Sequence, residues 1–336
     1  MASNGSDIRI GMVGAGAIAQ VAHLPVLRKM KGVVLAGICD NDGAKARALS
    51  QRMGIQDAYT DIEDLLEFSH SDAVVISTPN HLHEVHALAA LAKGAHVIVE
   101  RPIALTSAGV ARVLKAAEKA GRNVLVAMNH RFRSDVQAVW KFVNGGELGD
   151  VMTIRSGWHV FRAAKQQLGW RSRRAESGGG VMMDLGLPMV DLAWWLAGRP
   201  EIERVSAHMR SSGQVDDVGS ALLYCANGPT IFCDVSWRYV GDGEKFWCDI
   251  QGAKGSSSLT PFKVYKELHG VAADVTPAGA TGREHQFTMS YRAEWAYFLA
   301  GVRGEVELMP PEDQVRLHRI MEAIYRSADE QRDIKL

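Results

Sequence analysis

Cysteine is scarce in this sequence, and its charge is balanced. Among 336 residues there are 4 cysteines, 38 lysine or arginine residues and 38 aspartate or glutamate residues. The cysteines form no Cys-x-x-Cys pair and show no zinc-type spacing, so we expect reduced thiols without a disulfide framework. A balanced charge gives no surface-wide attraction to nucleic acid or to an anionic membrane, and we expect neither as a partner.

Long hydrophobic runs are also missing. No apolar stretch reaches the roughly 18 residues that a membrane-spanning helix needs, and the polar start, Met1 to Asp7, lacks the apolar core of a signal peptide. We therefore expect a cytoplasmic protein. The length exceeds the roughly 250–300 residues at which a single core stops growing, so it predicts two domains.

The first part of the chain alternates two kinds of hydrophobic pattern. Short apolar runs rich in β-branched residues are followed by stretches with helical spacing, which predicts a parallel sheet covered by helices on both faces. The expected strands are residues 8–13, 33–39, 73–77, 95–99 and 124–128, and the expected helices are residues 17–30, 43–53, 62–68, 83–91 and 107–120.

The pattern changes beyond residue 130. Longer runs with partial alternation, separated by turn signals such as Asn227-Gly228, indicate a large, mostly antiparallel open sheet. We predict an α/β domain at residues 1–130 and an α+β domain at residues 131–336. The expected strands of the second domain are residues 151–160, 202–210, 217–225, 229–238 and 246–251, and its expected helices are residues 188–197, 290–301 and 311–327.

A glycine-rich motif, Gly14-Ala15-Gly16-Ala17-Ile18-Ala19, follows the first expected strand and opens the first expected helix. This is the dinucleotide fingerprint G-x-G-x-x-G/A in the context that its mechanism needs, so it makes residues 1–130 a Rossmann domain. Gly14 permits the tight turn, and Gly16 lets the backbone approach a pyrophosphate. Ala17 and Ile18 then begin a helix whose first N–H groups and dipole attract phosphates.

Asp40 ends the second expected strand, about 20 residues after the fingerprint, where a carboxylate accepts hydrogen bonds from the adenosine ribose. The same charge repels a 2′-phosphate, so Asp40 predicts NAD rather than NADP, although the neighbouring Asn41 leaves some room for the phosphate. The alternative is a tight turn without a ligand, in which Asp40 is a solvated strand end.

Further motifs occur in order along nearly the whole chain. They are Thr78-Pro79-Asn80-His81-Leu82-His83, Glu100-Arg101-Pro102, Asn129-His130-Arg131-Phe132, Gly178-Gly179-Gly180 with Asp184 and Asp191, and Tyr325-Arg326-Ser327-Ala328. Jointly with the fingerprint, these motifs resemble the Gfo/Idh/MocA family of glucose–fructose oxidoreductases and inositol dehydrogenases.

The resemblance implies an oxidoreductase that transfers a hydride between a nicotinamide and a sugar, sugar acid or cyclitol. It also implies that the open sheet forms a subunit interface, so we expect a homodimer or homotetramer. The residues that it places along the dinucleotide are Thr78, Pro79, Asn80 and His83 in the cleft, and Glu100, Arg101 and Asn129 close to the nicotinamide.

The sequence departs from the family at the acid–base chemistry. Arg101 and Pro188 stand where the family has the Lys and His that hold and relay the proton of alcohol oxidation. A guanidinium stays protonated and cannot act as a base, and Pro188 suits the first turn of a helix. Arg101 could polarise a carbonyl or a developing alkoxide, bind a substrate anion, or simply pair with Asp184 or Glu100.

Two replacements for the missing groups are available. Asp184 would be a base if burial raised its pKa, and the alternative is a structural acceptor beside the glycine-rich loop. His159, on an expected strand, is the candidate replacement imidazole, and the alternative is an ordinary half-buried residue. His81, His83 and His86 lack a fourth ligand of matching spacing, so we expect no metal site.

A basic stretch lies between Trp158 and the triple glycine. Its arginine and tryptophan side chains predict contact with an anionic carbohydrate, such as a sugar acid or a phosphorylated sugar, and the alternative is a solvated loop. The candidate substrate residues are Arg131, Trp158, Arg162, Trp170, Arg171 and Asp184, with Lys165, Arg173 and Arg174 in the same stretch. The glycines at 178–180 would let a ligand approach the backbone closely.

These observations predict an NAD-dependent sugar oxidoreductase with an atypical acid–base site. Two other functions stay open. Tightly held NAD could be reduced and reoxidised within one cycle, which would permit elimination, epimerisation or glycoside cleavage without net redox. The chain could also be a non-catalytic protein that binds a dinucleotide or a sugar.

Overall fold

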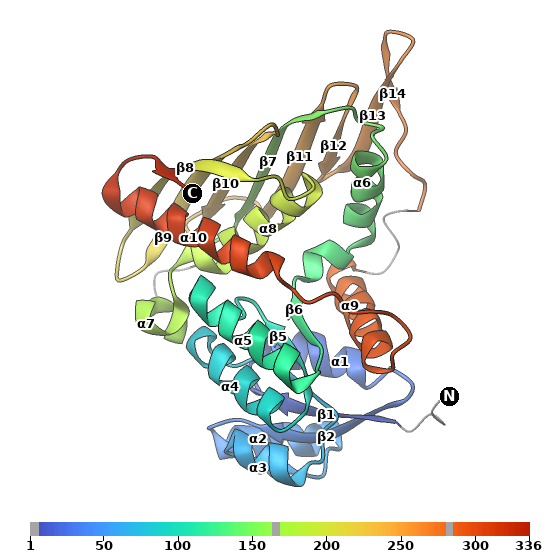
Figure 1. Cartoon of the computed structure of the whole chain (residues 1–336), viewed down its shortest axis with the longest axis vertical. Coiled ribbons are helices and arrows are strands. Elements are labelled where there is room, and N and C mark those ends of the chain that lie inside the picture. The colour runs from blue at the N-terminus through green and yellow to red at the C-terminus, as the bar shows by residue number, and fades with distance from the viewer. Residues whose placement is uncertain (1–6, 163–168, 280–284) are drawn as a thin grey trace. The chain divides into compact units, whose positions relative to one another are not determined.

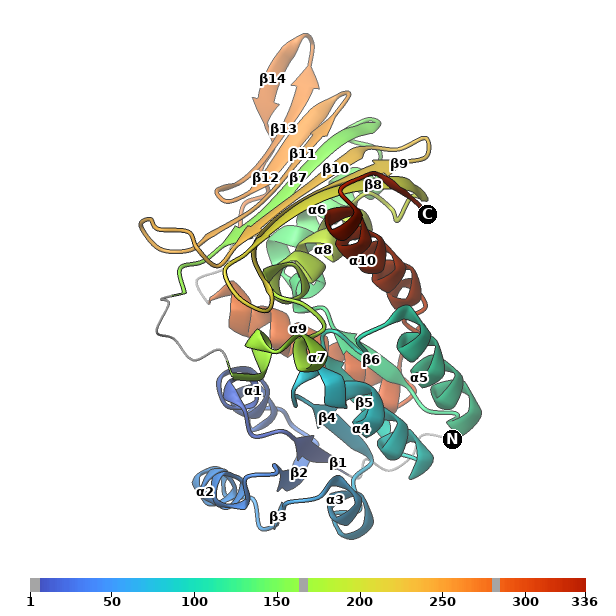
Figure 2. The same cartoon turned by 90° about the vertical axis from the view of Figure 1, so that its left-hand side faces the viewer.

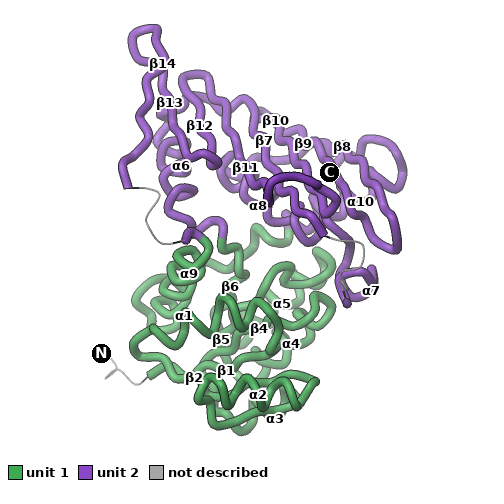
Figure 3. Tube along the Cα trace, turned by 180° about the vertical axis from the view of Figure 1, so that it is seen from behind, with its two compact units in different colours: residues 1–129, 287–315 green, residues 130–286, 316–336 purple. Residues whose placement is uncertain are grey.

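The computed structural model describes residues 7–162, 169–279 and 285–336, so Lys165 of the basic stretch lies outside the described residues. The chain divides into two compact units, which Figure 3 colours separately. Unit 1 comprises residues 1–129 and 287–315, and unit 2 comprises residues 130–286 and 316–336. Each unit is built around its own sheet.

Unit 1 has a six-stranded sheet in the order β3-β2-β1-β4-β5-β6, and all neighbouring strands run parallel (Figure 1). This confirms the predicted parallel sheet and gives it the Rossmann strand order. β4 is apolar and buried at every position because helices cover both faces of the sheet. The strands are β1 (Ile8–Val13), β2 (Val33–Cys39), β3 (Ala58–Tyr59), β4 (Ala73–Ile76), β5 (His96–Glu100) and β6 (Val124–Ala127).

Helices flank this sheet on two sides. Apolar residues of α1, α2 and α9 form a common core with one face of the sheet, and α3, α4 and α5 line the other face (Figure 2). The side chains of Asp42 and Thr106 accept backbone N–H groups at the starts of α2 and α5, which stabilises both helices. The helical segments are η1 (Ala19–His23), α1 (Leu24–Leu27), α2 (Gly43–Met53), α3 (Ile62–Phe68), α4 (Asn80–Ala92), α5 (Ser107–Ala120) and α9 (Gln286–Val302).

Helix α9 packs into unit 1 although every strand of the second sheet except the last, at residues 334–335, precedes it in the sequence. Tyr291, Trp295 and Phe298 of this helix are almost completely buried in the core of unit 1. Burying aromatic side chains removes a large apolar surface from water, which explains the packing. The division expected at residue 130 assigned residues 287–315 to the second domain, because helical periodicity identifies a helix without showing which sheet it covers.

Unit 2 has a nine-stranded sheet in the order β14-β13-β12-β11-β7-β10-β9-β8-β15. β7 and β10 run parallel and the other neighbours run antiparallel, which confirms the predicted mostly antiparallel sheet. The strands are β7 (Val151–His159), β8 (Ile202–Ser211), β9 (Asp216–Cys225), β10 (Thr230–Ser236), β11 (Lys245–Gly252), β12 (Gly255–Leu259), β13 (Phe262–Leu268), β14 (Val271–Asp274) and β15 (Ile334–Lys335).

Three helices of unit 2, α6 (Ser134–Asn144), α8 (Leu187–Leu196) and α10 (Asp313–Glu330), lie against one face of its sheet (Figure 2). Ser156 Oγ of β7 donates to Met189 O of α8 at 3.3 Å, so Ser156 marks the covered face. Arg155 and Phe232 lie on the opposite face, where the guanidinium stacks on the ring at 5.3 Å. No helix of the described residues is both long and apolar enough to cross a membrane. The helical segments are η2 (Asn129–Phe132), α6 (Ser134–Asn144), η3 (Gly169–Ser172), α7 (Arg174–Ser177), η4 (Met182–Gly186), α8 (Leu187–Leu196) and α10 (Asp313–Glu330).

Candidate functional site

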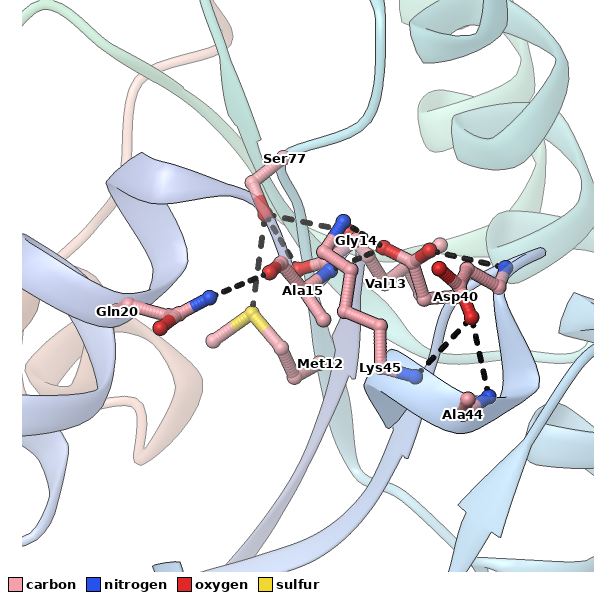
Figure 4. Close-up of polar contacts among 10 residues, drawn as sticks. Met12, Val13, Gly14, Ala15, Gln20, Asp40, Ala44, Lys45 and Ser77 are labelled. Atoms are coloured by element: carbon pink, nitrogen blue, oxygen red, sulfur yellow. Dashed lines mark hydrogen bonds and ion pairs between the residues drawn. The ribbon is translucent and has the colours of Figure 1, made fainter. Parts of the chain in front are cut away.

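The fingerprint motif forms a tight turn between β1 and η1 (Figure 4). Gly14 has a φ of 99°, and a Cβ there would lie 2.7 Å from the carbonyl carbon and oxygen of Ser77, so this position needs glycine. A Cβ on Gly16 would meet Ser77 O at 3.8 Å, so the protein's own packing does not require that glycine. The room beside Gly16 suits the close approach of a pyrophosphate. Ala17 is exposed and Ile18 partly exposed at the start of the helix.

Asp40, at the end of β2, is tied to this turn. Its Oδ2 accepts hydrogen bonds from the Ala15 N–H at 2.8 Å and from Lys45 Nζ at 2.9 Å, and its Oδ1 accepts one from the Asp42 N–H at 3.1 Å. Burial alone would raise the pKa of Asp40, but these donors outweigh burial and lower the pKa below its usual value. Asp40 is therefore charged beside the fingerprint, next to the exposed Asn41. Lys45 is a cation that the sequence argument missed.

The loop after β4 is joined to the loop after β5 through His83. The ring of His83 is buried, and its nitrogens lie 2.7 Å from Pro102 O and 2.7 Å from Thr78 O. Burial lowers the pKa of His83. Pro79 precedes α4, and Asn80 is buried at the first position of that helix. His83 thus fixes the two loops that the resemblance places along the dinucleotide.

Glu100, at the end of β5, is the centre of a buried hydrogen-bond network. Its Oε1 lies 3.0 Å from His23 Nε2 and accepts the hydroxyl of Tyr291 at 3.1 Å. On the other side of the imidazole, Trp295 Nε1 donates to His23 Nδ1 at 3.0 Å. An indole nitrogen can only donate, so Nδ1 of His23 is the acceptor and the ring proton lies on Nε2, directed at Glu100. This fixes the orientation of the carboxylate.

The network also favours the ionised form of Glu100. Burial alone would raise the pKa of Glu100, but hydrogen bonds from His23 and Tyr291 and the charge of Arg101 lower the pKa below its usual value. Arg101 itself is partly exposed. The Glu100-Arg101 motif therefore presents a fixed anion and a neighbouring cation.

Helix α9 supports two of the motif residues that the resemblance places near the nicotinamide. Tyr291 contacts Glu100 as above, and Ser290 Oγ accepts a hydrogen bond from Nδ2 of the buried Asn129 at 3.1 Å. Sequence reasoning missed this support. The available signal was the aromatic spacing of an expected helix, which does not name its partners.

In unit 2, Asp184 of η4 is surrounded by donors. Its Oδ2 accepts from Arg162 Nη2 at 2.7 Å and from Trp237 Nε1 at 3.1 Å, and its Oδ1 lies 3.7 Å from Arg171 Nε. The guanidinium of Arg162 also stacks over the Trp237 ring at 4.8 Å, and that of Arg171 over Trp170 at 4.3 Å. The structure thus brings four expected substrate residues together and adds Trp237, which the sequence argument missed.

The network at Glu100 and the group of residues around Asp184 each include a helical turn that is wider than an α-turn. In η1 and in η4 the closing backbone hydrogen bond joins residues five apart. Such turns are rare in proteins overall, and those that occur are often found at functional sites. They carry His23 and Asp184, and Pro188 follows in the first turn of α8, which confirms its expected structural position. Among the described residues, no group of three or more His, Cys, Asp or Glu side chains is placed to hold a metal ion.

Two family models match this chain along most of its length. Residues 8–128 match an oxidoreductase family with an NAD-binding Rossmann fold, and residues 136–258 match the Gfo/Idh/MocA C-terminal domain. The chain belongs to the Gfo/Idh/MocA family. This confirms the resemblance drawn from the motifs.

Full-length Gfo/Idh/MocA relatives include sugar dehydrogenases. D-glucoside 3-dehydrogenase of Escherichia coli (strain K12) is 26% identical over 356 residues, which cover 98% of this chain and 97% of the relative. D-xylose 1-dehydrogenase (NADP(+)) 2 of Haloferax volcanii is 29% identical over 322 residues, covering 95% and 97%. A solved structure of levoglucosan dehydrogenase in complex with NADH has the same fold, with a TM-score of 0.90 at 21% identity, covering 98% and 99%. These names differ in coenzyme, so they do not distinguish NAD from NADP for this chain.

Two further residues that we expected at the substrate, Arg131 and Trp158, contact other side chains of unit 2. Arg131, from the family motif at 129–132, forms a two-pronged pair with the buried Asp191 of α8 through Nη2 and through Nε, the latter at 2.8 Å. Trp158 packs edge-on against His130 and Phe246, with ring centroids 5.4 and 5.8 Å apart. Breaking a buried ion pair is costly, so Arg131 holds η2 to α8. Contact of either residue with a substrate stays a prediction.

His159 does not lie beside Asp184. His159 Nε2 is 3.2 Å from Asp234 Oδ2, and its ring packs edge-on against Trp247 with centroids 4.8 Å apart. Alternation along β7 turns His159 away from the face on which Ser156 contacts α8, which is the face that η4 also covers. The structure therefore separates two residues that the sequence argument grouped for proton handling.

The triple glycine allows protein groups, rather than a ligand, to approach the backbone. A Cβ on Gly179 would lie 1.9 Å from the Tyr325 hydroxyl, and a Cβ on Gly180 would lie 1.9 Å from Asp216 O. The Asp216 carboxylate accepts the N–H groups of Gly180 and Met182, each at 2.7 Å, and the Tyr325 hydroxyl at 3.2 Å. The expected ligand position is therefore filled by β9 and α10, which anchor η4.

Proposed function

We propose that this chain is an NAD-dependent oxidoreductase that oxidises a secondary alcohol of a sugar, sugar acid or cyclitol, or reduces the matching ketone. The observation that carries the proposal is the junction between Asp40 and the fingerprint turn, where an ionised carboxylate holds the Ala15 N–H (Figure 4). In this arrangement a pyrophosphate fits beside Gly16, and the remaining lone pairs of the Asp40 carboxylate accept the ribose hydroxyls. Membership in an NAD-binding oxidoreductase family supports this function.

The described residues fit an NAD molecule, which when bound supplies the hydride acceptor for a substrate carbon. Asp40 binds the adenosine ribose and disfavours a 2′-phosphate. The groups that we assign to the coenzyme are Gly14, Gly16, Ala17 and Ile18 at the pyrophosphate, Asp40 and Asn41 at the ribose, Thr78, Pro79, Asn80 and His83 along the cleft, and Glu100, Arg101 and Asn129 at the nicotinamide.

Glu100 and Arg101 have complementary electrostatic roles in this proposal. A buried carboxylate stabilises a nearby cation more strongly than an exposed carboxylate does, because water screens the exposed charge. The oxidised nicotinamide is cationic and the reduced one is neutral, so the Glu100 anion favours binding of the oxidised form. Arg101 stabilises the negative charge that develops on the substrate oxygen.

Asp184 takes the proton in this proposal. Oxidation breaks the C–H bond, whose electron pair leaves with the hydride, and the O–H bond, whose proton needs an acceptor. Arg101 cannot accept it because a guanidinium stays protonated. Asp184 lies beside two arginines rather than in the buried surroundings that would make it a stronger base. We assign it the proton because it is the carboxylate that Arg162 and Trp237 orient, and it then releases the proton to water.

A direct spectrophotometric assay tests this function. Purified protein is mixed with NAD and a panel of neutral sugars, sugar acids and phosphorylated sugars, and reduced nicotinamide is followed by its absorbance. We expect the absorbance of reduced nicotinamide to rise with time, and we expect Arg101→Met and Asp184→Asn each to lower the rate of this rise. Substrate conversion without released NADH would instead indicate an enzyme that retains its coenzyme. The absence of affinity for any adenine dinucleotide would overturn the proposal.

We also propose that a second copy of the chain covers the face of the unit 2 sheet that lies opposite the helices. Phe232 and Tyr265 are exposed large side chains on that face. Light scattering coupled to size exclusion would measure a dimer or tetramer if this is so, and a monomer at micromolar concentration would contradict it.

A further inference from the structure

The arginines near the triple glycine contact different carboxylates. Arg173 pairs with its own acidic neighbour, Glu176, through two hydrogen bonds of 2.5 and 2.8 Å. Arg162 and Arg171 instead meet on one carboxylate, that of Asp184, at 2.7 and 3.7 Å. These three groups, which we call the Asp184 cluster, comprise two guanidinium groups and one carboxylate.

The two guanidinium groups of the Asp184 cluster are held in fixed positions. Arg162 stacks on the Trp237 ring at 4.8 Å, and Arg171 stacks on the Trp170 ring at 4.3 Å. A stacked guanidinium has a defined plane, so little side-chain freedom is lost when it binds a second group. Trp237 also donates to Asp184 at 3.1 Å, so the carboxylate and both rings form one arrangement.

The cluster is open to small molecules. The side chains of Arg162, Arg171 and Asp184 are 24%, 42% and 22% exposed. Each guanidinium carries five N–H donors, which is more than one carboxylate can accept. Planar N–H pairs match the oxygens of a carboxylate or a phosphate. Asp184 lowers the repulsion between the two cations, and its own charge directs an anion to the N–H edges turned away from it.

We propose that the Asp184 cluster binds an anionic group of the substrate, a carboxylate or a phosphate, so that acidic sugars are preferred over neutral ones. The inference rests on the proposed function, in which Asp184 contacts the substrate. It adds the chemical class of that substrate, and Arg162 and Arg171 are the residues that select it.

A purely structural role for Arg162 makes a different prediction. Its backbone N–H donates to Trp237 O at 2.8 Å, and its side chain holds η4 through Asp184. If Arg162 only stabilised this packing, its loss would lower thermal stability and would weaken the binding of acidic and neutral sugars equally. Selective loss of the acidic sugars requires contact with the anionic group.

The test compares matched sugars on matched variants. Binding of D-glucuronate, D-glucose 6-phosphate and methyl D-glucoside is titrated with the NADH-loaded protein, using the shift in thermal unfolding and the tryptophan fluorescence. The variants are Arg162→Gln and the more exposed Arg171→Gln, with Arg173→Gln as the control from the same stretch. NADH binding is measured first, so that failure of the proposed function is seen separately.

We expect at least one acidic sugar to bind about 10-fold or more tightly than the neutral glycoside, because a charge-assisted pair adds that much. Arg162→Gln or Arg171→Gln should remove this preference, and Arg173→Gln should keep it. The glucuronate and phosphate arms tell which anion is recognised. Equal binding of all three sugars by an NADH-binding protein would overturn the inference, as would an unchanged preference in both cluster variants.

Discussion

Tyr291 and Glu100 are 191 positions apart in the sequence, and the Tyr291 hydroxyl donates to Glu100 Oε1 at 3.1 Å in the core of unit 1. Burial and the charge of Glu100 raise the pKa of Tyr291 well above its usual value, so the hydroxyl keeps its proton and donates. The same carboxylate oxygen faces His23 Nε2 at 3.0 Å. Two donors from different parts of the chain thus hold one anion at the end of β5.

Tyr291→Phe keeps the ring and removes this donor. Hydrogen bonds to charged groups contribute about 1.5–3 kcal/mol, so the free energy of unfolding should fall by about that amount near neutral pH. The pKa of Glu100 should rise, because the anion loses a partner, and the acid limb of the kcat/KM profile should move to higher pH. Denaturant titration and pH–rate profiles measure both, with Tyr265→Phe on the exposed face of unit 2 as control.

The sign of the pH effect on stability follows from the same carboxylate. The folded-state pKa of Glu100 lies below the ordinary 4.5 of a glutamate, so ionised Glu100 stabilises the fold above pH 4.5. This contribution is lost as the pH falls through the folded-state pKa. Tyr291→Phe should raise the folded-state pKa of Glu100 and so narrow the interval between that pKa and 4.5. An unchanged acid limb together with lower stability would show that the hydroxyl serves packing alone.

The coenzyme preference should depend on Asp40 and Lys45, whose side chains meet at 2.9 Å. Asp40→Ala should weaken NAD about 10-fold, because a charged acceptor for the ribose is lost, and should relax discrimination against NADP. Lys45→Met should weaken NADP more than NAD, because it removes the cation beside a 2′-phosphate. Calorimetric titration of both coenzymes measures this. Lys93→Met, which breaks an exposed surface pair with Glu67, should change binding of neither coenzyme. Preference of the unmutated protein for NADP would contradict the assignment.

Replacing Arg101 with lysine should change how activity depends on pH. An arginine cannot titrate near neutrality, whereas a partly buried lysine can. Arg101→Lys restores the family residue and should add an ionisation on the alkaline side of the kcat/KM profile. Arg101→Met should lower kcat by roughly 100-fold or more, the typical loss for an oxyanion-stabilising group. Arg112→Lys, in an exposed pair with Glu84, is the control. Identical profiles for Arg101→Lys and the unmutated protein would remove Arg101 from the reaction.

Local patterns predicted most of unit 1. The bounds expected for β1, β2, α2, α3 and α5 agree with the structure, because each element shows its own periodicity and turn residues. The strands at 255–274 were not expected. β13 reads Phe-Lys-Val-Tyr-Lys-Glu-Leu, a β-favourable pattern that was missed. β12 reads Gly-Ser-Ser-Ser-Leu and takes its strand conformation from pairing with β11 and β13. Strand propensity here depends on neighbours rather than on the residues themselves.

The candidate site divides in the same way. The fingerprint and Asp40 are contiguous signals with a known spacing, so the sequence predicted them. The network at Glu100 joins residues 23, 100, 291 and 295, and no local pattern relates these positions. His159 and Asp184 were grouped by chemistry alone, and only the register of β7 against its helices shows that they lie on different faces.

The close packing behind η4 gives a prediction about stability. Gly180→Ala would place a methyl group 1.9 Å from Asp216 O, a backbone atom that cannot move without shifting β9. The N–H of Gly180 also donates to the Asp216 carboxylate at 2.7 Å, so a shift would weaken a buried hydrogen bond. We expect a loss of about 3 kcal/mol or more in the free energy of unfolding, the range of overpacking combined with a broken buried contact.

Gly213→Ala is the matched control for Gly180→Ala, because Gly213 also lies in unit 2 and a Cβ there would meet nothing within 4 Å. Removing a glycine without a clash restricts the unfolded chain, so this variant should keep its stability or gain about 0.4–1 kcal/mol. Denaturant unfolding of both variants measures the contrast. Similar stability of the two would mean that the backbone at Gly180 yields without cost, and the packing of β9 and α10 would then not be what fixes Asp184 in place.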